Sequence, residues 1–147
     1  MAVAEGESPF DLYANALKQL DDASRGRLSQ WSKDILLFAE LTDGIVWDGL
    51  VTWLGNNWSQ ASDAVAAFRG IGASEVAADL DAALALVRVN PRADAATANT
   101  LALRNDAAAF NALVAAEAMI ERDWALLWDM AEAYARSNGW SATATQA

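Results

Sequence analysis

The 147-residue chain contains no cysteine and no histidine. It therefore has no disulfide, no thiolate nucleophile, no Cys/His zinc site and none of the side chains that usually titrate near neutrality. Proline and glycine are scarce, with two and eight residues, and β-branched residues rarely cluster, so helix propensity exceeds strand propensity almost everywhere. The chain also lacks an apolar run of the roughly 20 residues that cross a bilayer, and its first residues do not resemble a signal peptide. We expect a cytoplasmic, helical protein without a cofactor, a bound metal or a membrane segment.

Apolar and acidic residues are abundant. Hydrophobic residues make up 54% of the sequence, which is enough for a buried core, and a chain of this length fits one domain. Twenty acidic residues against ten basic ones give a net charge of −10. This charge repels phosphates, so direct binding to nucleic acid is disfavoured and basic partners are favoured. An acidic surface that serves solubility alone is the alternative.

Helix signals predict one all-α domain over residues 1–137, a compact bundle of about six helices, with a frayed polar tail at 138–147. Residues 90–100 are expected to form a surface loop, with at most a fragment of helix. The sequence does not decide whether the last helix breaks near residues 121–123. The expected helices run from Ser8 to about Leu20, from Ser29 to Gly44, from Ile45 to Leu54, from Ser59 to Gly70 or Gly72, from Ser74 to before Pro91, and from about Asn105 to Ser137.

Three tryptophans surround a predicted turn in the stretch WDGLVTWLGNNWSQASD, residues 47–63. They could form a box of rings for a ligand, or a helix-turn-helix corner in which large rings fill the space that alanine leaves. Few polar residues stand near them to hold a ligand, so we favour a buried or half-buried corner, with Trp47 on a buried helical stripe. The expected corner residues are Trp47, Gly49, Trp53, Asn56, Trp58 and Gly72.

This corner also resembles a known family. DGLVTWLGNN, at residues 48–57, followed by AVAAFRGIGASEVAADLDAALAL, at residues 64–86, is similar to the small, all-helical DNA mimic protein family, long catalogued as a domain of unknown function. The family's turn has the pattern Asn-Gly-Gly-aromatic-x-Gln-aromatic-aromatic-x-Asn. In this chain Gly49 stands at its last glycine, Trp53 at the first paired aromatic and Asn56 at its asparagine.

The resemblance extends over most of the chain from about residue 28, and Ile71-Gly72-Ala73 matches the family's Ile-Gly-Ala junction. The chain departs from the pattern where Trp47-Asp48 replace Asn-Gly and where Thr52 replaces the glutamine. The resemblance implies an all-helical protein that competes with nucleic acid for a basic DNA-binding partner, such as a transcriptional regulator.

Carboxylates at helical spacing are the candidate partner-binding residues. Side chains at i and i+4 share a helix face, and a row of them can follow the phosphates that proteins contact on a duplex. Like charges at this spacing destabilise a helix by a few tenths of a kcal/mol, so their presence suggests that they have a function. Arg122 and Arg136 would neutralise part of the row, and an ordinary solvated face is the alternative. The predicted acidic face consists of Asp63, Glu75, Asp79, Asp81, Glu117, Glu121, Asp129 and Glu132.

Two other functions stay open. A protein-interaction, adaptor or immunity-type domain without mimicry would use an apolar surface patch, for which Trp31 and Trp140 are the candidates because helical periodicity places them least firmly. An enzyme would depend on paired carboxylates such as Asp79 with Asp81, and no nucleophile elbow, phosphate loop or calcium-loop spacing is present. We therefore do not expect an enzyme. A homodimer through a helix face is an open alternative for the assembly.

Overall fold

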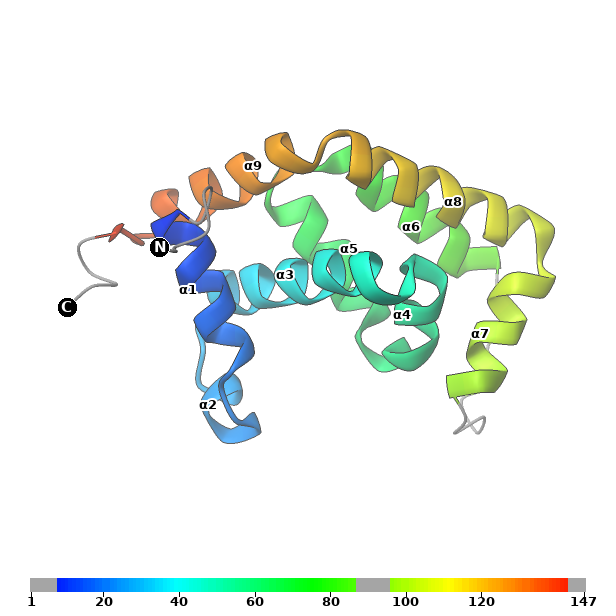
Figure 1. Cartoon of the computed structure of the whole chain (residues 1–147), viewed down its shortest axis with the longest axis horizontal. Helices are drawn as coiled ribbons and strands as arrows, with labels where there is room; N and C mark the ends of the chain where they lie inside the picture. Colours follow the sequence, from blue (N-terminus) through cyan, green and yellow to red (C-terminus); the bar gives the residue numbers. More distant parts are fainter. Residues whose placement is uncertain (1–7, 87–95, 143–147) are drawn as a thin grey trace.

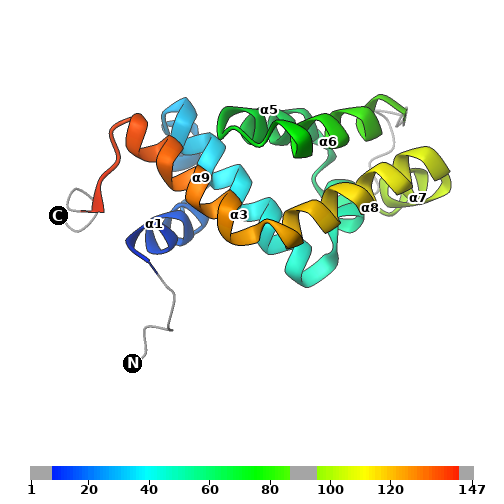
Figure 2. The same cartoon turned by 90° about the horizontal axis from the view of Figure 1, so that it is seen from above.

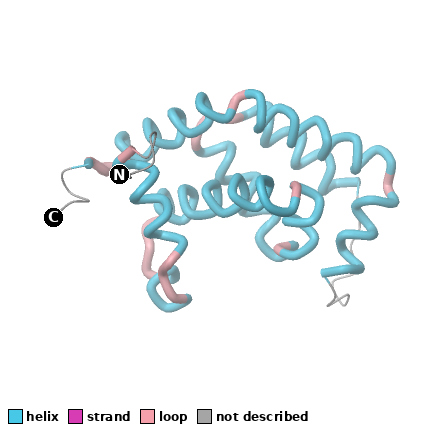
Figure 3. Tube along the Cα trace, viewed as in Figure 1, coloured by secondary structure: helices cyan, strands magenta, loops and turns pink. Residues whose placement is uncertain are grey.

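A computed structural model describes residues 8–86 and 96–142 (Figure 1). Within these ranges the chain is helical almost throughout and has no strand (Figure 3), which confirms the all-α prediction. The described part has nine α-helices and one 3₁₀ helix instead of about six helices. Their bounds are α1 Pro9–Lys18, α2 Asp22–Gly26, α3 Gln30–Asp48, α4 Leu50–Asn56, η1 Trp58–Gln60, α5 Ala61–Gly70, α6 Ser74–Leu86, α7 Ala96–Asn105, α8 Ala107–Arg122 and α9 Trp124–Ser137.

Helix α3 lies at the centre, and α1, α4, α5 and α9 all pack on it. Helix α8 packs along α6 and leads into α9, so that the two last helices form an arc over α3 in Figure 1. Seen from above, α5 and α6 lie on one side of this arc and α1 lies on the other (Figure 2). The core passes through α3, where the side chains of Ile35, Phe38 and Leu41 are fully buried.

Helix α3 is longer than predicted, because Gly44 does not end it. The helix continues to Asp48, and the turn comes at Gly49, whose φ of 82° is a conformation that side-chain-bearing residues rarely adopt. A Cβ at Gly44 would overlap the indole ring of Trp53, so this glycine serves close packing between α3 and α4. The glycine at position 44 is therefore explained by a contact between two helices and not by a helix end.

A local capping signal sets the start of α1 as predicted. Ser8 accepts a hydrogen bond from the Asp11 amide at 3.1 Å, while Asp11 accepts one from the Ser8 amide at 3.2 Å, and these two bonds form a capping box at the start of α1. Gly72, with a φ of 93°, follows the end of α5. The long final segment does break, at Asp123, into α8 and α9.

The predicted loop at 90–100 and the predicted frayed tail at 138–147 both differ in part from the structure. Residues 96–100 belong to α7, whereas residues 87–95 lie outside the described part of the chain. In the tail, Asn138 and Gly139 are exposed, but Trp140 is only 6% exposed and its ring packs against those of Phe10 and Tyr13. Residues 143–147 lie outside the described residues.

No helix in the described ranges has both the length and the apolar composition that crossing a membrane would demand.

Candidate partner-binding site

The tryptophan corner is not the single helix-turn-helix that we predicted. Gly49 separates α3 from α4, and Asn57 separates α4 from η1, so Asn56 lies at the exposed end of α4 instead of in the turn. The neighbouring Asn57 donates its side-chain amide to the Trp53 carbonyl at 2.9 Å. The side chain of Asn57 thus bonds the backbone at the end of α4.

The three tryptophans of this corner have different environments. Trp53 is 7% exposed and Trp58 is half-buried, in agreement with a space-filling role. Trp47 is 78% exposed, so the prediction that it lies on a buried stripe was wrong. Because α3 continues through Gly44, Trp47 lies on the last turn of α3. The buried residues Leu50 and Leu54 belong to a different helix, α4.

The expected apolar patch of Trp31 and Trp140 does not form either. Trp140 is buried against Phe10, and Trp31 is half-buried with its ring stacked on Tyr13. The guanidinium of Arg136 also lies over the Trp140 ring, 4.9 Å from its centre. The ring contacts of Trp140 thus attach the segment after α9 to α1.

Three adjoining hollows define the candidate site. The first, of about 490 Å³, lies between α1 and α9 with α3 as its floor. The second surrounds Trp47 on α3 and shares Lys18 and Asp43 with the first. The third lies between the end of α3, α4 and α8, and shares Asp48 with the second.

Seven carboxylates line these hollows, and we call them the acidic track. Two come from α9, three from α3, one from α1 and one from α8. The four helices thus bring acids together that lie far apart in the sequence. The members are Asp11, Glu40, Asp43, Asp48, Glu117, Asp129 and Glu132.

The track contains only part of the predicted acidic face. Glu117, Asp129 and Glu132 belong to both, and Glu121 lies one turn beyond Glu117 on α8 without lining a hollow. The other four residues lie on α5 and α6 and line none of the three hollows. They are Asp63, Glu75, Asp79 and Asp81.

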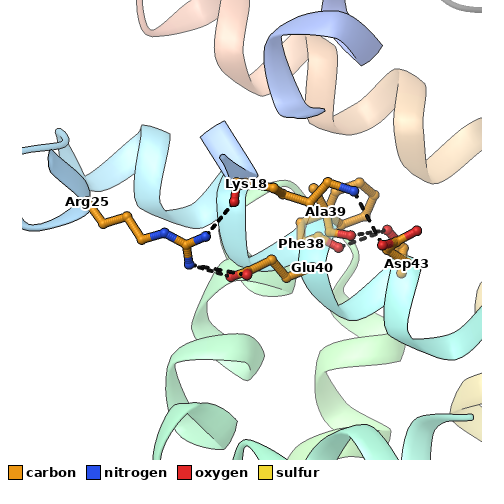
Figure 4. Close-up of polar contacts among 7 residues, drawn as sticks. Lys18, Arg25, Phe38, Ala39, Glu40 and Asp43 are labelled. Carbon is orange, nitrogen blue, oxygen red and sulfur yellow. Dashed lines mark hydrogen bonds and ion pairs between the residues drawn. The ribbon is translucent and has the colours of Figure 1, made fainter. Parts of the chain in front are cut away.

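Two of the track's three carboxylates on α3 form ion pairs with nearby cations (Figure 4). Arg25 on α2 pairs with Glu40 at 3.2 Å and donates to the Lys18 carbonyl at 2.7 Å, which ties α2 to the end of α1. The ammonium of Lys18 lies 3.4 Å from the Asp43 carboxylate. These contacts hold α1, α2 and α3 together and neutralise the middle of the track.

Glu117 has a structural role. Its Oε1 accepts a hydrogen bond of 2.6 Å from the amide of Leu50, the first residue of α4, although 67 positions separate them. The amides of a helix's first turn have no partner within the helix, and a carboxylate there also meets the positive end of the helix dipole. Glu117 therefore caps α4 from α8.

The remaining charges leave the track negative. Arg136 pairs with Glu132 at 2.8 Å, and Arg104 lines the third hollow. Seven carboxylates thus stand against four cations, which are Lys18, Arg25, Arg104 and Arg136. In the part of the chain that the structure describes, Asp48 and Asp129 have neither an ion pair nor a hydrogen bond.

The four predicted acids outside the track are also partly matched. Asp81 lies 3.7 Å from Arg69 in an exposed ion pair. The pKa of the Arg122 guanidinium is raised, chiefly by its hydrogen bond to Asp123 and to a smaller extent by the charge of Glu75. Glu75 on α6 therefore lies near the end of α8. The sequence predicted that Arg122 would neutralise part of the acidic row, but its ion pair is with the neighbouring Asp123, at 2.8 Å.

A buried polar pair lies away from the track. Asp34, 8% exposed, accepts hydrogen bonds from the Tyr134 hydroxyl at 2.7 Å and from the Gln30 side chain at 3.1 Å. Burial, followed by the hydrogen bond to the Asp34 carboxylate and its charge, raises the pKa of Tyr134 to about 12. This pair joins α3 to α9.

Among the described residues no three acidic side chains gather closely enough to hold a metal ion.

Sequence reasoning missed Asp11, Glu40, Asp43 and Asp48. Three of them lie on α3, and the expected stop at Gly44 separated Asp48 from the other two. In a helix that continues to residue 48, Glu40, Asp43 and Trp47 follow at steps of three and four and share a face. That spacing was the available signal.

No family model, curated protein or solved structure matches the chain.

Proposed function

We propose that this protein is an acidic protein-binding module that competes with nucleic acid for a basic DNA-binding partner. Support comes from the acidic track, in which seven carboxylates from four helices line adjoining hollows and exceed the four described cations that lie beside them. A protein surface that binds DNA is basic, and a negative track would attract it over about a Debye length, roughly 8 Å at physiological salt. The sequence resemblance to DNA mimic proteins points to the same class of partner.

The spacing of the track suggests that it replaces only a short stretch of a duplex. From Glu40 to Asp48 the axis of α3 rises by about 12 Å, and a duplex carries about seven phosphate charges over that length. The track has three carboxylates there, two of them already paired with Lys18 and Arg25. We therefore expect moderate affinity that falls with salt, and a need for contacts other than charge.

A matched pair of charge variants tests the proposal. Asp48→Asn with Asp129→Asn removes two charges from the track that have no ion pair or hydrogen bond among the described residues. Asp63→Asn with Asp79→Asn removes two such charges from α5 and α6. Each immobilised variant would be exposed to a nuclease-treated lysate at 50 and 300 mM NaCl. Proteins captured only at low salt would then be bound to labelled DNA, and the parent and both variants would be added as competitors.

The proposal requires that the parent displace a captured protein from DNA and that the track variant do so several-fold less well. The α5–α6 variant, which has the same net charge, must compete like the parent. Equal weakening in both variants would mean that the net charge acts without a defined site. Failure of the parent to displace any captured protein from DNA would refute the proposed function.

An interaction domain without mimicry is the second candidate, favoured by one observation. Val46 and Trp47, 64% and 78% exposed, are neighbouring apolar side chains on the last turn of α3. Large exposed apolar groups are enriched where proteins meet other proteins. A partner captured equally at both salt concentrations and unable to bind DNA would favour this function.

A further inference from the structure

We propose that Trp47 anchors the basic partner by receiving one arginine side chain, whose guanidinium lies on the indole face and beside the Asp48 carboxylate. This inference rests on the proposed function, since it names the group of the partner that the acidic track receives. It assigns the centre of the contact to the second hollow, where Trp47 stands between the other two parts of the track.

The exposure of Trp47 requires an explanation, because this chain buries or half-buries its other large rings. Trp53, in the same hollow, is 7% exposed, while Trp47 is 78% exposed and Val46 beside it is 64% exposed. Tryptophan is among the residues that contribute most at protein interfaces, where its large surface is covered on binding. The position is therefore available as an anchor without any rearrangement of the core.

The charges around Trp47 select a cation. The last turn of α3 contains no basic residue but does contain Asp48, which has no ion pair or hydrogen bond within the described residues. The carboxyl end of a helix carries a partial negative charge that favours a cation, so Asp48 adds a like charge to it. Glu40 and Asp43 line the same hollow, but Arg25 and Lys18 already match them. The unmatched charge lies at the end of the helix, next to the exposed ring.

Arginine fits this pair of groups better than lysine. Its planar guanidinium stacks on an aromatic face and can donate two parallel hydrogen bonds to one carboxylate, whereas an ammonium is a strongly hydrated point charge. A second copy of this chain is a poor occupant, because a symmetric contact at Trp47 would bring two Asp48 carboxylates together in a protein of net charge −10.

The test uses two blocked peptides of equal charge, hexa-arginine and hexa-lysine, added to the full chain at 50 mM NaCl. The protein's seven indole N–H signals are followed by nitrogen–proton NMR, and the signal that disappears in Trp47→Phe identifies Trp47. Affinities are measured by calorimetry for the parent, Trp47→Ala, Asp48→Asn and Leu86→Ala. Leu86 is an exposed apolar residue on α6, at 48% exposure, and serves as the matched control.

We expect hexa-arginine to shift the Trp47 signal more than the other six. Trp47→Ala should bind hexa-arginine about 5-fold more weakly, the loss expected for one partly solvated cation–π contact, while Leu86→Ala binds like the parent. The loss for hexa-lysine should be smaller. Asp48→Asn should also weaken hexa-arginine binding.

Two results would overturn the anchor. In the first, both peptides bind in a salt-sensitive way but Trp47→Ala has the parent's affinity. The acidic track would then bind cations without a contribution from Trp47. In the second, the Trp47 signal shifts with protein concentration before any peptide is added, which would assign the surface to a second copy. If neither peptide binds the parent at 50 mM NaCl, the proposed function fails together with the anchor.

Discussion

The hydrogen bond between Glu117 and Leu50 allows a precise test of how α8 stabilises α4. Glu117→Ala removes the oxygen that accepts from the Leu50 amide at 2.6 Å, and Leu50 is fully buried. A buried amide left without an acceptor costs about 1–3 kcal/mol. For a chain near 150 residues, each kcal/mol lowers the melting temperature by about 2–4 °C, so we expect a decrease of about 2–12 °C, measured by circular dichroism together with urea unfolding.

Glu121→Ala is the matched control, because Glu121 lies one turn away on the same helix, is exposed and has no hydrogen bond or ion pair among the described residues. Both variants lose one negative charge and gain the same small helix propensity of alanine, so their difference isolates the bond. Glu117→Gln keeps an acceptor oxygen and should lie between Glu117→Ala and the parent. Equal unfolding midpoints for Glu117→Ala and Glu121→Ala would refute the capping role.

Three further predictions concern the rest of the fold. The folded-state pKa of Tyr134 lies above its ordinary value of 10, at about 12, so the stability that its protonated form contributes is fully present below pH 10 and disappears as the pH rises from 10 to 12. Tyr134→Phe should remove that part of the alkaline loss, measured by urea midpoints from pH 8 to 11. Gly44→Ala should be destabilising despite a helix-propensity gain of about 1 kcal/mol, because a Cβ that overlaps Trp53 costs about 1–3 kcal/mol; a stabilised variant would contradict this packing. Gly49→Ala should cost about 1–3 kcal/mol through its φ of 82° and ψ of 159°, whereas Gly26→Ala, which meets no atom within 4 Å, should be neutral in thermal unfolding.

Features decided by neighbouring residues were predictable from the sequence. The all-α class follows from composition, and the start of α1 follows from Ser8 and Asp11, which bond each other's amides within one turn. The chain reversal at Gly72 is of the same kind. Each of these signals acts over three or four positions, the range in which sequence pattern and structure correspond directly.

Features decided by contacts between distant residues were not predictable in this way. A glycine at position 44 suggests the end of a helix when only its neighbours in sequence are considered. The Trp53 ring that packs against it gives a different reason for a glycine at this position. Because α3 then extends to Asp48, Trp47 moves from the core to the surface and Glu40, Asp43 and Trp47 come to share a face. The misplaced helix end therefore hid the exposed positions of Trp47 and Asp48 at the end of α3.

Helical spacing also cannot distinguish an acid that caps a helix from one that faces a partner. Glu117 and Glu121 have the spacing of a binding row, yet Glu117 already accepts the Leu50 amide. A carboxylate engaged in this way has less to gain from an external cation, since its charge is already stabilised and one of its oxygens is occupied. Asp48 and Asp129 have no such contact within the described residues, so a partner's arginine or lysine would gain most there. The binding energy of the acidic track should accordingly concentrate at these two residues, and substitutions at Glu117 should act mainly through stability.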